Sequence, residues 1–232
     1  MYSDIREEAC EANRMLPKTG LVEMTFGNVG VFDKSKGVFA IKPSGVDYAE
    51  LTPETMVIVD LEGKVVDGKL RPSSDTPTYV ELFKNFNVRA VAHTHSIFAT
   101  AFAQALKPIP ALGTTHADYF YGEVPVTRAL TDSEIKGDYE LETGKVIVET
   151  FKALNLSPDK MHAVLVRSHA PFIWADSGVD VLHYALALEV CAKMASISLG
   201  VNPELCPMQK TLMDKHYLRK HGANAYYGQP KA

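Results

Sequence analysis

Hydrophobic and polar positions along the chain recur with two different periods. Within residues 4–18 the apolar residues Ile5, Ala9, Ala12 and Leu16 return at helical spacing, which predicts an amphipathic helix. Similar patterns bounded by capping residues, prolines and glycines predict helices over 76–86, 96–106, 140–154, 177–200 and 207–220. Short apolar runs between turn residues predict strands within 21–42, which folds back once, and at 56–61, 65–66, 88–95, 163–166 and 171–175.

Several predicted strands lie close enough in sequence to pair as hairpins. Residues 56–61 turn back into 65–66, and 163–166 is followed closely by 171–175. Hairpins join antiparallel strands, whereas parallel strands need long crossover connections. We therefore predict an α/β protein with one domain over residues 1–232, in which three α/β/α layers place helices on both faces of a mixed or mainly antiparallel sheet.

Composition and charge narrow the class of protein. The 232 residues are 46% hydrophobic and 22% charged, which is ordinary for a globular chain. The net charge is −4 and no basic tract occurs, so we expect no nucleic-acid partner. The most apolar long stretch, 181–200, contains His183, Glu189 and Lys193, so it is predicted to be a buried helix and not a membrane span.

The cysteines and the first ten residues indicate the cellular location of the protein. Cys10, Cys191 and Cys206 are far apart, odd in number and never in a C-x-x-C pair, which argues against a disulfide framework. The first ten residues carry four charges and lack the apolar segment of a signal peptide. A cytoplasmic location is the expectation.

Two predicted strands end in histidine. His93 and His95 are two residues apart, so their side chains leave a strand on the same face. His169 follows the 163–166 strand and reaches the same point if both strands share a sheet and a direction. Three imidazoles with an open position are typical of a catalytic zinc site, although another divalent transition metal suits the same ligands. Alternatively, these histidines cap loops or form hydrogen bonds in the core.

A second group of candidates precedes the helix predicted at 76–86. Ser73, Ser74 and Asp75 supply hydroxyl groups and a carboxylate next to the amides of a helix N-terminus, a combination that suits a phosphate group. Asp75 has three open interpretations, as an N-terminal cap, a fourth metal ligand or a base. The alternative for the whole stretch is an ordinary capping loop.

Two further loops are suited to an anion. Gly27-Asn28 allows close backbone approach, and Lys42 adds a positive charge beside Ser44 and Gly45. Both sequences are also common in ordinary turns. Glycine and asparagine at 27–30 are expected to interrupt the first strand.

The aromatic segment 113–122 combines His116 and Asp118 with several hydroxyl groups. We expect short strands or loops over residues 111–128, which contain this segment, and partial burial that raises the pKa of Asp118 toward a range useful for acid–base catalysis. The alternative is an aromatic corner of the core with satisfied polar groups.

Taken together, these segments resemble the L-ribulose-5-phosphate 4-epimerases of the class II aldolase/epimerase superfamily. The resemblance covers essentially the whole chain, and the order and spacing of its motifs are more specific than any single motif. The segments that carry it are Leu-Val-x-x-Thr-x-Gly-Asn at 21–28, Ile-Lys-Pro-Ser-Gly-Val-Asp-Tyr at 41–48, Pro-Ser-Ser-Asp-Thr-Pro-Thr at 72–78, His-Thr-His-Ser at 93–96, 113–122, 214–223 and 225–229.

The resemblance implies a role for each candidate. Zinc would be bound by His93, His95 and His169, with Asp75 as a fourth ligand. The substrate and its phosphate would be held by Gly27, Asn28, Lys42, Ser44, Gly45, Ser73 and Ser74. Asp118 and Tyr227 would be the acid–base pair, with Tyr227 supplied by a neighbouring subunit of a homotetramer. His216, Arg219 and Glu140 would support the site.

The implied reaction interconverts L-ribulose 5-phosphate and D-xylulose 5-phosphate by retro-aldol cleavage and re-addition at carbon 4. One alternative is a class II aldolase acting on fuculose or rhamnulose phosphates, in which a glutamate tends to occupy the position of Asp75. The other is a non-catalytic zinc-binding module of the same fold, as in the adducin head. No nicotinamide is implied, in keeping with the lack of a G-x-G-x-x-G motif after a strand.

Overall fold

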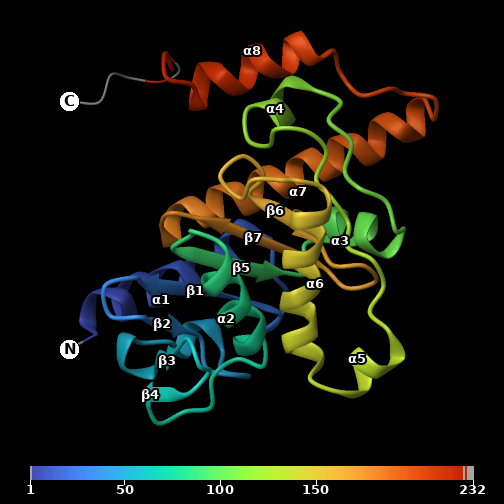
Figure 1. Ribbon diagram of the computed structural model, residues 1–232. Coiled ribbons are helices and arrows are strands. Elements are labelled where there is room, and N and C mark those ends of the chain that lie inside the picture. Colours follow the sequence, from blue (N-terminus) through green and yellow to red (C-terminus); the bar gives the residue numbers. More distant parts are fainter. Residues whose placement is uncertain (1, 227, 229–232) are drawn as a thin grey trace.

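A seven-stranded sheet forms the centre of the computed structural model, which describes residues 2–226 and 228 (Figure 1). The strand order is β4-β3-β2-β1-β5-β7-β6, and every pairing between these strands is antiparallel. The prediction of a mainly antiparallel sheet is therefore confirmed. The strands are β1 (Gly27–Asp33), β2 (Val38–Ile41), β3 (Val57–Asp60), β4 (Val65–Asp67), β5 (Ala90–Thr94), β6 (Ala163–Leu165) and β7 (Pro171–Ala175).

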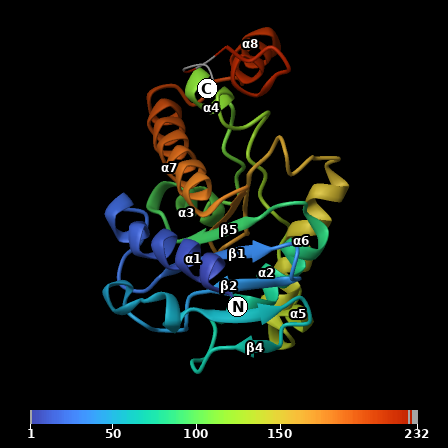
Figure 2. The same ribbon diagram turned by 90° about the vertical axis from the view of Figure 1, so that its left-hand side faces the viewer.

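Helices cover both faces of the sheet, as predicted. Helices α1, α3 and α7 pack together on one face, and α2 and α6 pack together on the other (Figure 2). Helices α4 and α8 contact each other beyond α7, at one end of the molecule. The α-helices are α1 (Ser3–Met15), α2 (Thr76–Asn85), α3 (Ile97–Gln104), α4 (Thr114–Ala117), α5 (Asp132–Lys136), α6 (Tyr139–Ala153), α7 (Gly178–Val201) and α8 (Lys210–His221). Single 3₁₀ turns occupy Leu16–Thr19, Tyr48–Glu50 and Pro53–Thr55.

Both predicted hairpins are present, as β3–β4 and β6–β7. One local prediction was wrong. The first strand is not interrupted at 27–30 but begins at Gly27 and runs through Gly30. Residues 111–128 are mostly loop, as expected, apart from the one-turn helix α4. Gly222 follows α8 with a φ of −77°, which is not the left-handed conformation of a glycine cap.

Gly30 is required inside β1 because an aromatic ring lies directly over it. A Cβ at this position would lie 2.7 Å from Cδ1 of Tyr79. The Tyr79 ring is fully buried, and its hydroxyl donates a 3.0 Å hydrogen bond to the carbonyl oxygen of Asn28, so the ring has little room to move.

We expect Gly30→Ala to lower the free energy of unfolding by about 1–3 kcal/mol, the usual cost of overpacking a close-packed core. Denaturant unfolding measures this change. Gly200→Ala is the matched control, because a Cβ at Gly200 meets nothing within 4 Å. Equal unfolding midpoints for Gly30→Ala and Gly200→Ala would show that the Tyr79 ring can move aside without loss of stability.

The sheet register brings the two histidine-bearing strand ends together. His93 in β5 lies opposite Asn28 of β1 and Phe172 of β7, so these three side chains share the face covered by α2 and α6. Strands β5 and β6 each pair antiparallel with β7, so they run in the same direction. The condition stated for His169 to reach His93 and His95 is therefore met.

Helix α7 is long and apolar enough, by length and composition, to cross a membrane. It packs against β5, β7, α1 and α3, so the prediction of a buried helix holds for that face. Its other face exposes apolar side chains. These are Val190, Met194, Ile197 and Val201.

Candidate metal and substrate site

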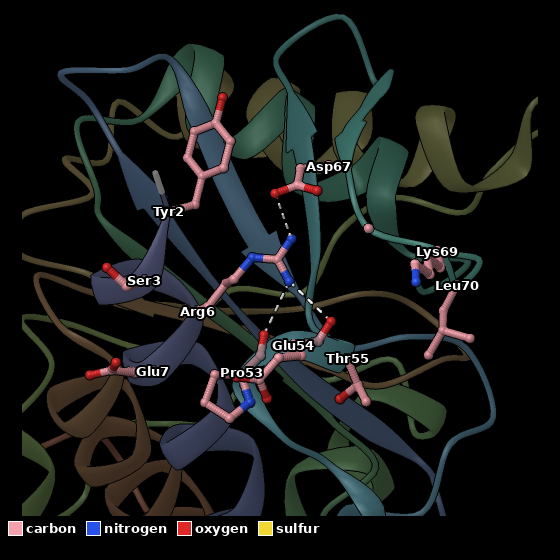
Figure 3. Close-up of a pocket in the computed structure, with 11 residues that line it drawn as sticks. Tyr2, Ser3, Arg6, Glu7, Pro53, Glu54, Thr55, Asp67, Lys69 and Leu70 are labelled. Carbon is pink, nitrogen blue, oxygen red and sulfur yellow. Dashed lines mark hydrogen bonds and ion pairs between the residues drawn. The ribbon is translucent and has the colours of Figure 1, made fainter.

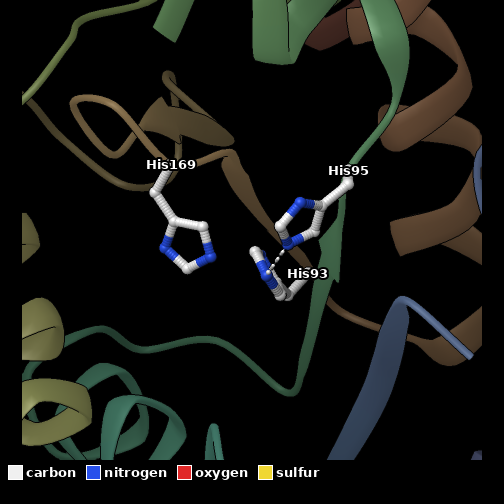
Figure 4. A group of neighbouring side chains, drawn as sticks. All are labelled: His93, His95 and His169. Atoms are coloured by element: carbon white, nitrogen blue, oxygen red, sulfur yellow. Dashed lines mark hydrogen bonds between the residues drawn. The ribbon is translucent and has the colours of Figure 1, made fainter. Parts of the chain in front are cut away.

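Three histidines converge at the ends of β5 and β6. The ligand atoms of His93, His95 and His169 all lie within 4.8 Å of one another, and Figure 4 shows one nitrogen of each ring directed toward the others. His93 is buried and lies against Phe172, with ring centroids 4.3 Å apart. His169 follows Ser168, whose φ of 59° turns the chain sharply between β6 and β7. The histidines predicted from sequence are thus brought together.

The chemical state of these rings suits a divalent cation. Nδ1 of His93 lies 3.0 Å from the carbonyl oxygen of Pro171, so it carries the proton and leaves the lone pair on Nε2. That Nε2 lies 3.1 Å from Nε2 of His95. Burial, and then the neighbouring histidines, lower the pKa of His95 and lower that of His169 to about 4. Neutral imidazoles that face one another in this way could bind a metal ion.

The histidines line one wall of a cavity of about 420 Å³. Every substrate-binding candidate from the sequence lines the same cavity, together with Asp75 and Glu140. These are Gly27, Asn28, Lys42, Ser44, Gly45, Ser73 and Ser74. The two serine-containing loops are joined by hydrogen bonds from Ser44 N to the Arg71 carbonyl and from Ser73 N to the Lys42 carbonyl, each 3.0 Å. Segments far apart in sequence therefore form one polar wall.

Lys42 places a positive charge inside this wall. Its side chain is buried, its Nζ lies 3.5 Å from the carbonyl oxygen of Pro43 and 4.9 Å from the ring centroid of Tyr48. Among the described residues no carboxylate forms an ion pair with it. Burial lowers the pKa of Lys42, as expected for a cation that lacks a counterion. An anionic group entering the cavity would supply that counterion.

Asp75 does not act as a helix cap. It occupies the N-cap position of α2, yet its side chain accepts no hydrogen bond from the helix amides. Instead, its Oδ2 accepts hydrogen bonds from Nδ2 of Asn28 at 2.7 Å and from Oγ of Ser73 at 3.3 Å. The carboxylate is thereby held inside the histidine-lined cavity, and the roles of metal ligand and base remain open for it.

The structure does not bring Asp118 to the histidines. Asp118 ends α4 and receives hydrogen bonds from Arg219, at 2.7 and 3.1 Å, and from Nδ1 of His216 at 3.2 Å, both in α8. Burial alone would raise its pKa, but the hydrogen bonds and charges of Arg219 and His216 outweigh burial and lower it. The expectation of a raised pKa for Asp118 was therefore wrong. Tyr227 lies outside the described residues.

His116 fits the structural alternative for the aromatic segment only in part, because it is buried in the core but its Nδ1 has no hydrogen-bond partner among the described residues. It is 3% exposed, and its Nε2 donates a 2.7 Å hydrogen bond to the carbonyl oxygen of Gly122. Burial lowers the pKa of His116 to about 4. The unfolded chain, with the ordinary value near 6.5, therefore binds more protons than the folded chain between these pH values.

We expect the free energy of unfolding to fall as the pH drops from 6.5 toward 4, with about 3 kcal/mol at most due to His116. Urea unfolding at several pH values measures this change. Between pH 6.5 and 4, the free energy of unfolding of His116→Gln should fall by about 3 kcal/mol less than that of the wild type. His183→Gln, at an exposed position of α7, is the control and should keep the wild-type profile. An unchanged profile for His116→Gln would contradict the prediction.

Tyr139 is a site residue that sequence reasoning missed. It is the first residue of α6, lines the cavity, and places its hydroxyl oxygen 3.3 Å from Nδ1 of His169. Glu140, the next residue, was predicted as a supporting site residue. In the sequence, only the position of Tyr139 beside Glu140 at the start of a helix could have indicated a role for Tyr139 in the site.

A larger cavity of about 670 Å³ lies beside α1 and does not carry comparable chemistry (Figure 3). Its main charged group, Arg6, donates hydrogen bonds to the carbonyl oxygens of Pro53, Glu54 and Met56 and pairs with Asp67 at 3.0 Å. The guanidinium group is thus used to tie α1 to β4 and to the turn before β3. This cavity has a structural explanation.

The chain belongs to the class II aldolase and adducin N-terminal domain family, whose sequence model matches residues 7–196. It is 49% identical to the L-ribulose-5-phosphate 4-epimerase UlaF of Salmonella paratyphi B and 50% identical to that of Salmonella paratyphi C. Each match covers 97% of this chain and 98% of the relative. Among solved structures, an L-fuculose 1-phosphate aldolase matches with a TM-score of 0.77 and 25% identity, over 92% of this chain and 94% of that one.

Proposed function

We propose that this protein is an L-ribulose-5-phosphate 4-epimerase that interconverts L-ribulose 5-phosphate and D-xylulose 5-phosphate. The observation that carries the proposal is one cavity that combines three converging histidines with the buried cation of Lys42 and the serine loops. The near full-length identity to relatives named for this activity supports the choice of substrate. The reaction breaks and re-forms the bond between carbons 3 and 4.

The residues of the cavity divide into three groups, which would hold the metal ion, the phosphate and the sugar. His93, His95 and His169, with Asp75, would hold Zn²⁺ or another divalent cation, which supplies Lewis-acid stabilisation of the negative charge formed on cleavage. Lys42 would bind the substrate phosphate, because it is buried and forms no ion pair with a carboxylate in the described part of the chain. The hydroxyl groups and amides of Ser44, Ser73 and Ser74, with Gly45, would complete the phosphate site. Gly27 and Asn28 would contact the sugar.

Proton transfer would come from a neighbouring subunit. Asp118 directly follows α4, is hydrogen-bonded to α8, and is not among the residues that line the cavity of its own chain. We propose that Asp118 and Tyr227 of an adjacent subunit face this cavity in a homotetramer. The lowered pKa of Asp118 keeps it as a carboxylate, the form that accepts a proton, and Tyr227 would return a proton on the other side. Subunit association would also cover the exposed apolar face of α7.

Two further proposals complete the assignment. Residues 1–232 would form one domain, because a single large core joins α1, the sheet, α2, α6 and α7. The cellular location would be the cytoplasm, in keeping with three free cysteines.

A class II aldolase is the second candidate, favoured by the structural match to the fuculose phosphate enzyme. The two activities share cleavage and differ in whether the fragments are rejoined. Asp75, where a glutamate base would be expected in such aldolases, favours the epimerase.

The deciding experiment follows L-ribulose 5-phosphate by NMR in the presence of the purified protein. Formation of D-xylulose 5-phosphate, lost on adding a chelator and regained on adding Zn²⁺, is the expected result. L-Fuculose 1-phosphate is the parallel substrate. Release of dihydroxyacetone phosphate from it, without epimerisation of the pentulose, would assign the aldolase instead.

A further inference from the structure

His93 and His169 differ in what holds the ring nitrogen that faces away from the cluster. For His93 this nitrogen, Nδ1, is fixed by the backbone carbonyl of Pro171. For His169 the partner is a side chain, because the hydroxyl oxygen of Tyr139 lies 3.3 Å from Nδ1. His169 lies in the turn between β6 and β7, where the strands no longer fix the backbone. Its ring therefore depends more on a side-chain partner than the ring of His93 does.

Tyr139 is itself held in place. Thr143 Oγ1 donates a 2.9 Å hydrogen bond to the Tyr139 carbonyl oxygen, and Thr78 of α2 donates to the Glu140 carbonyl oxygen. Helix α6 packs closely on α2 at Gly144, where a Cβ would lie only 2.6 Å from Cβ of Glu81. The first turn of α6 is thus a rigid support that presents the Tyr139 hydroxyl to the cavity.

We propose that Tyr139 is a positioning residue for His169. Its hydroxyl oxygen accepts a hydrogen bond from Nδ1–H, which selects the tautomer with the lone pair on Nε2 and directs that atom toward His93 and His95. The inference rests on the proposed metal-dependent function, since it concerns the metal affinity of this site. Groups that orient ligand histidines in this way typically contribute 10–100-fold to metal affinity.

Tyr139→Phe tests the proposal, because it keeps the ring and removes only the hydroxyl. We expect the dissociation constant for Zn²⁺, measured by competition with a chromophoric chelator, to rise about 10–100-fold. In the metal-free protein, ¹⁵N NMR of the histidine side chains should show that His169 loses its preference for the Nδ1–H tautomer. The control is Tyr184→Phe, at a tyrosine that stacks on His162 with centroids 4.0 Å apart, outside the cavity.

The outcomes separate this inference from the proposed function. If the wild-type protein binds no divalent metal, the proposed function fails. If the wild type binds Zn²⁺ but Tyr139→Phe has the same affinity and the same His169 tautomer, the positioning role is wrong. An equal loss of affinity in Tyr184→Phe would also overturn it, because the effect would then not depend on contact with His169.

Discussion

Replacing His95 with asparagine is expected to lower kcat by about a thousand-fold or more and to leave the purified protein without bound divalent metal. Only two imidazoles and the proposed Asp75 carboxylate remain in His95→Asn, so the site loses one of its three nitrogen ligands and should hold the ion much more weakly. Loss of about 4 kcal/mol of transition-state stabilisation corresponds to a factor of roughly a thousand in rate. Elemental analysis of the protein and the epimerase assay measure the two effects.

His95 separates metal binding from folding better than His93 does. His93 is 3% exposed and stacks on Phe172, so its replacement also disturbs the core, whereas His95 is the most exposed of the three histidines. The unfolding midpoint of metal-free His95→Asn should therefore stay close to that of the metal-free wild type. His183→Asn, at an exposed position of α7, is the matched control. Full activity in His95→Asn would show that the histidine cluster is not the reaction centre.

The histidine cluster could be predicted from the sequence because it depends on local rules. Alternation along a strand places His93 and His95 on one face, and two successive antiparallel pairings with β7 give β5 and β6 the same direction. The layers of the fold were predicted for the same reason, since helix and hairpin patterns are readable over short windows. The prediction failed at Gly30, where the residue type was set by the ring of Tyr79, 49 positions further along the chain.

Predictions also failed where a property depends on distant partners. The pKa of Asp118 is decided by His216 and Arg219, which lie 98 and 101 positions away in the sequence. Local composition indicated burial, which was correct, but it could not show which charges accompany that burial. Tyr139 was missed because its relation to His169 arises from the packing of α6 on α2. Both cases concern contacts that no local pattern contains.

Mixing two inactive variants should restore activity if Asp118 acts on the cavity of a neighbouring subunit. The His95→Asn and Asp118→Asn variants, each expected to be inactive alone, would be dissociated from the proposed tetramer, combined in equal amounts and reassembled. An active site needs an intact histidine cavity from one subunit and an intact Asp118 from its neighbour. The cavity must therefore belong to an Asp118→Asn subunit, and the neighbour must be a His95→Asn subunit. Random assembly around a ring gives that arrangement for about a quarter of the sites, and the assay should recover about a quarter of wild-type activity.

The same experiment distinguishes a shared site from a site within one chain. If Asp118 and His95 serve the same subunit, every subunit in the mixture carries one defect, and no activity returns. A mixture of His95→Asn with His169→Asn is the matched control, because both residues line the same cavity and no arrangement of subunits can repair it. Recovery in the first mixture alone requires that the α4–α8 end of one subunit meets the histidine cavity of the next. The separation of Asp118 from the cavity within a single chain would then be a consequence of assembly.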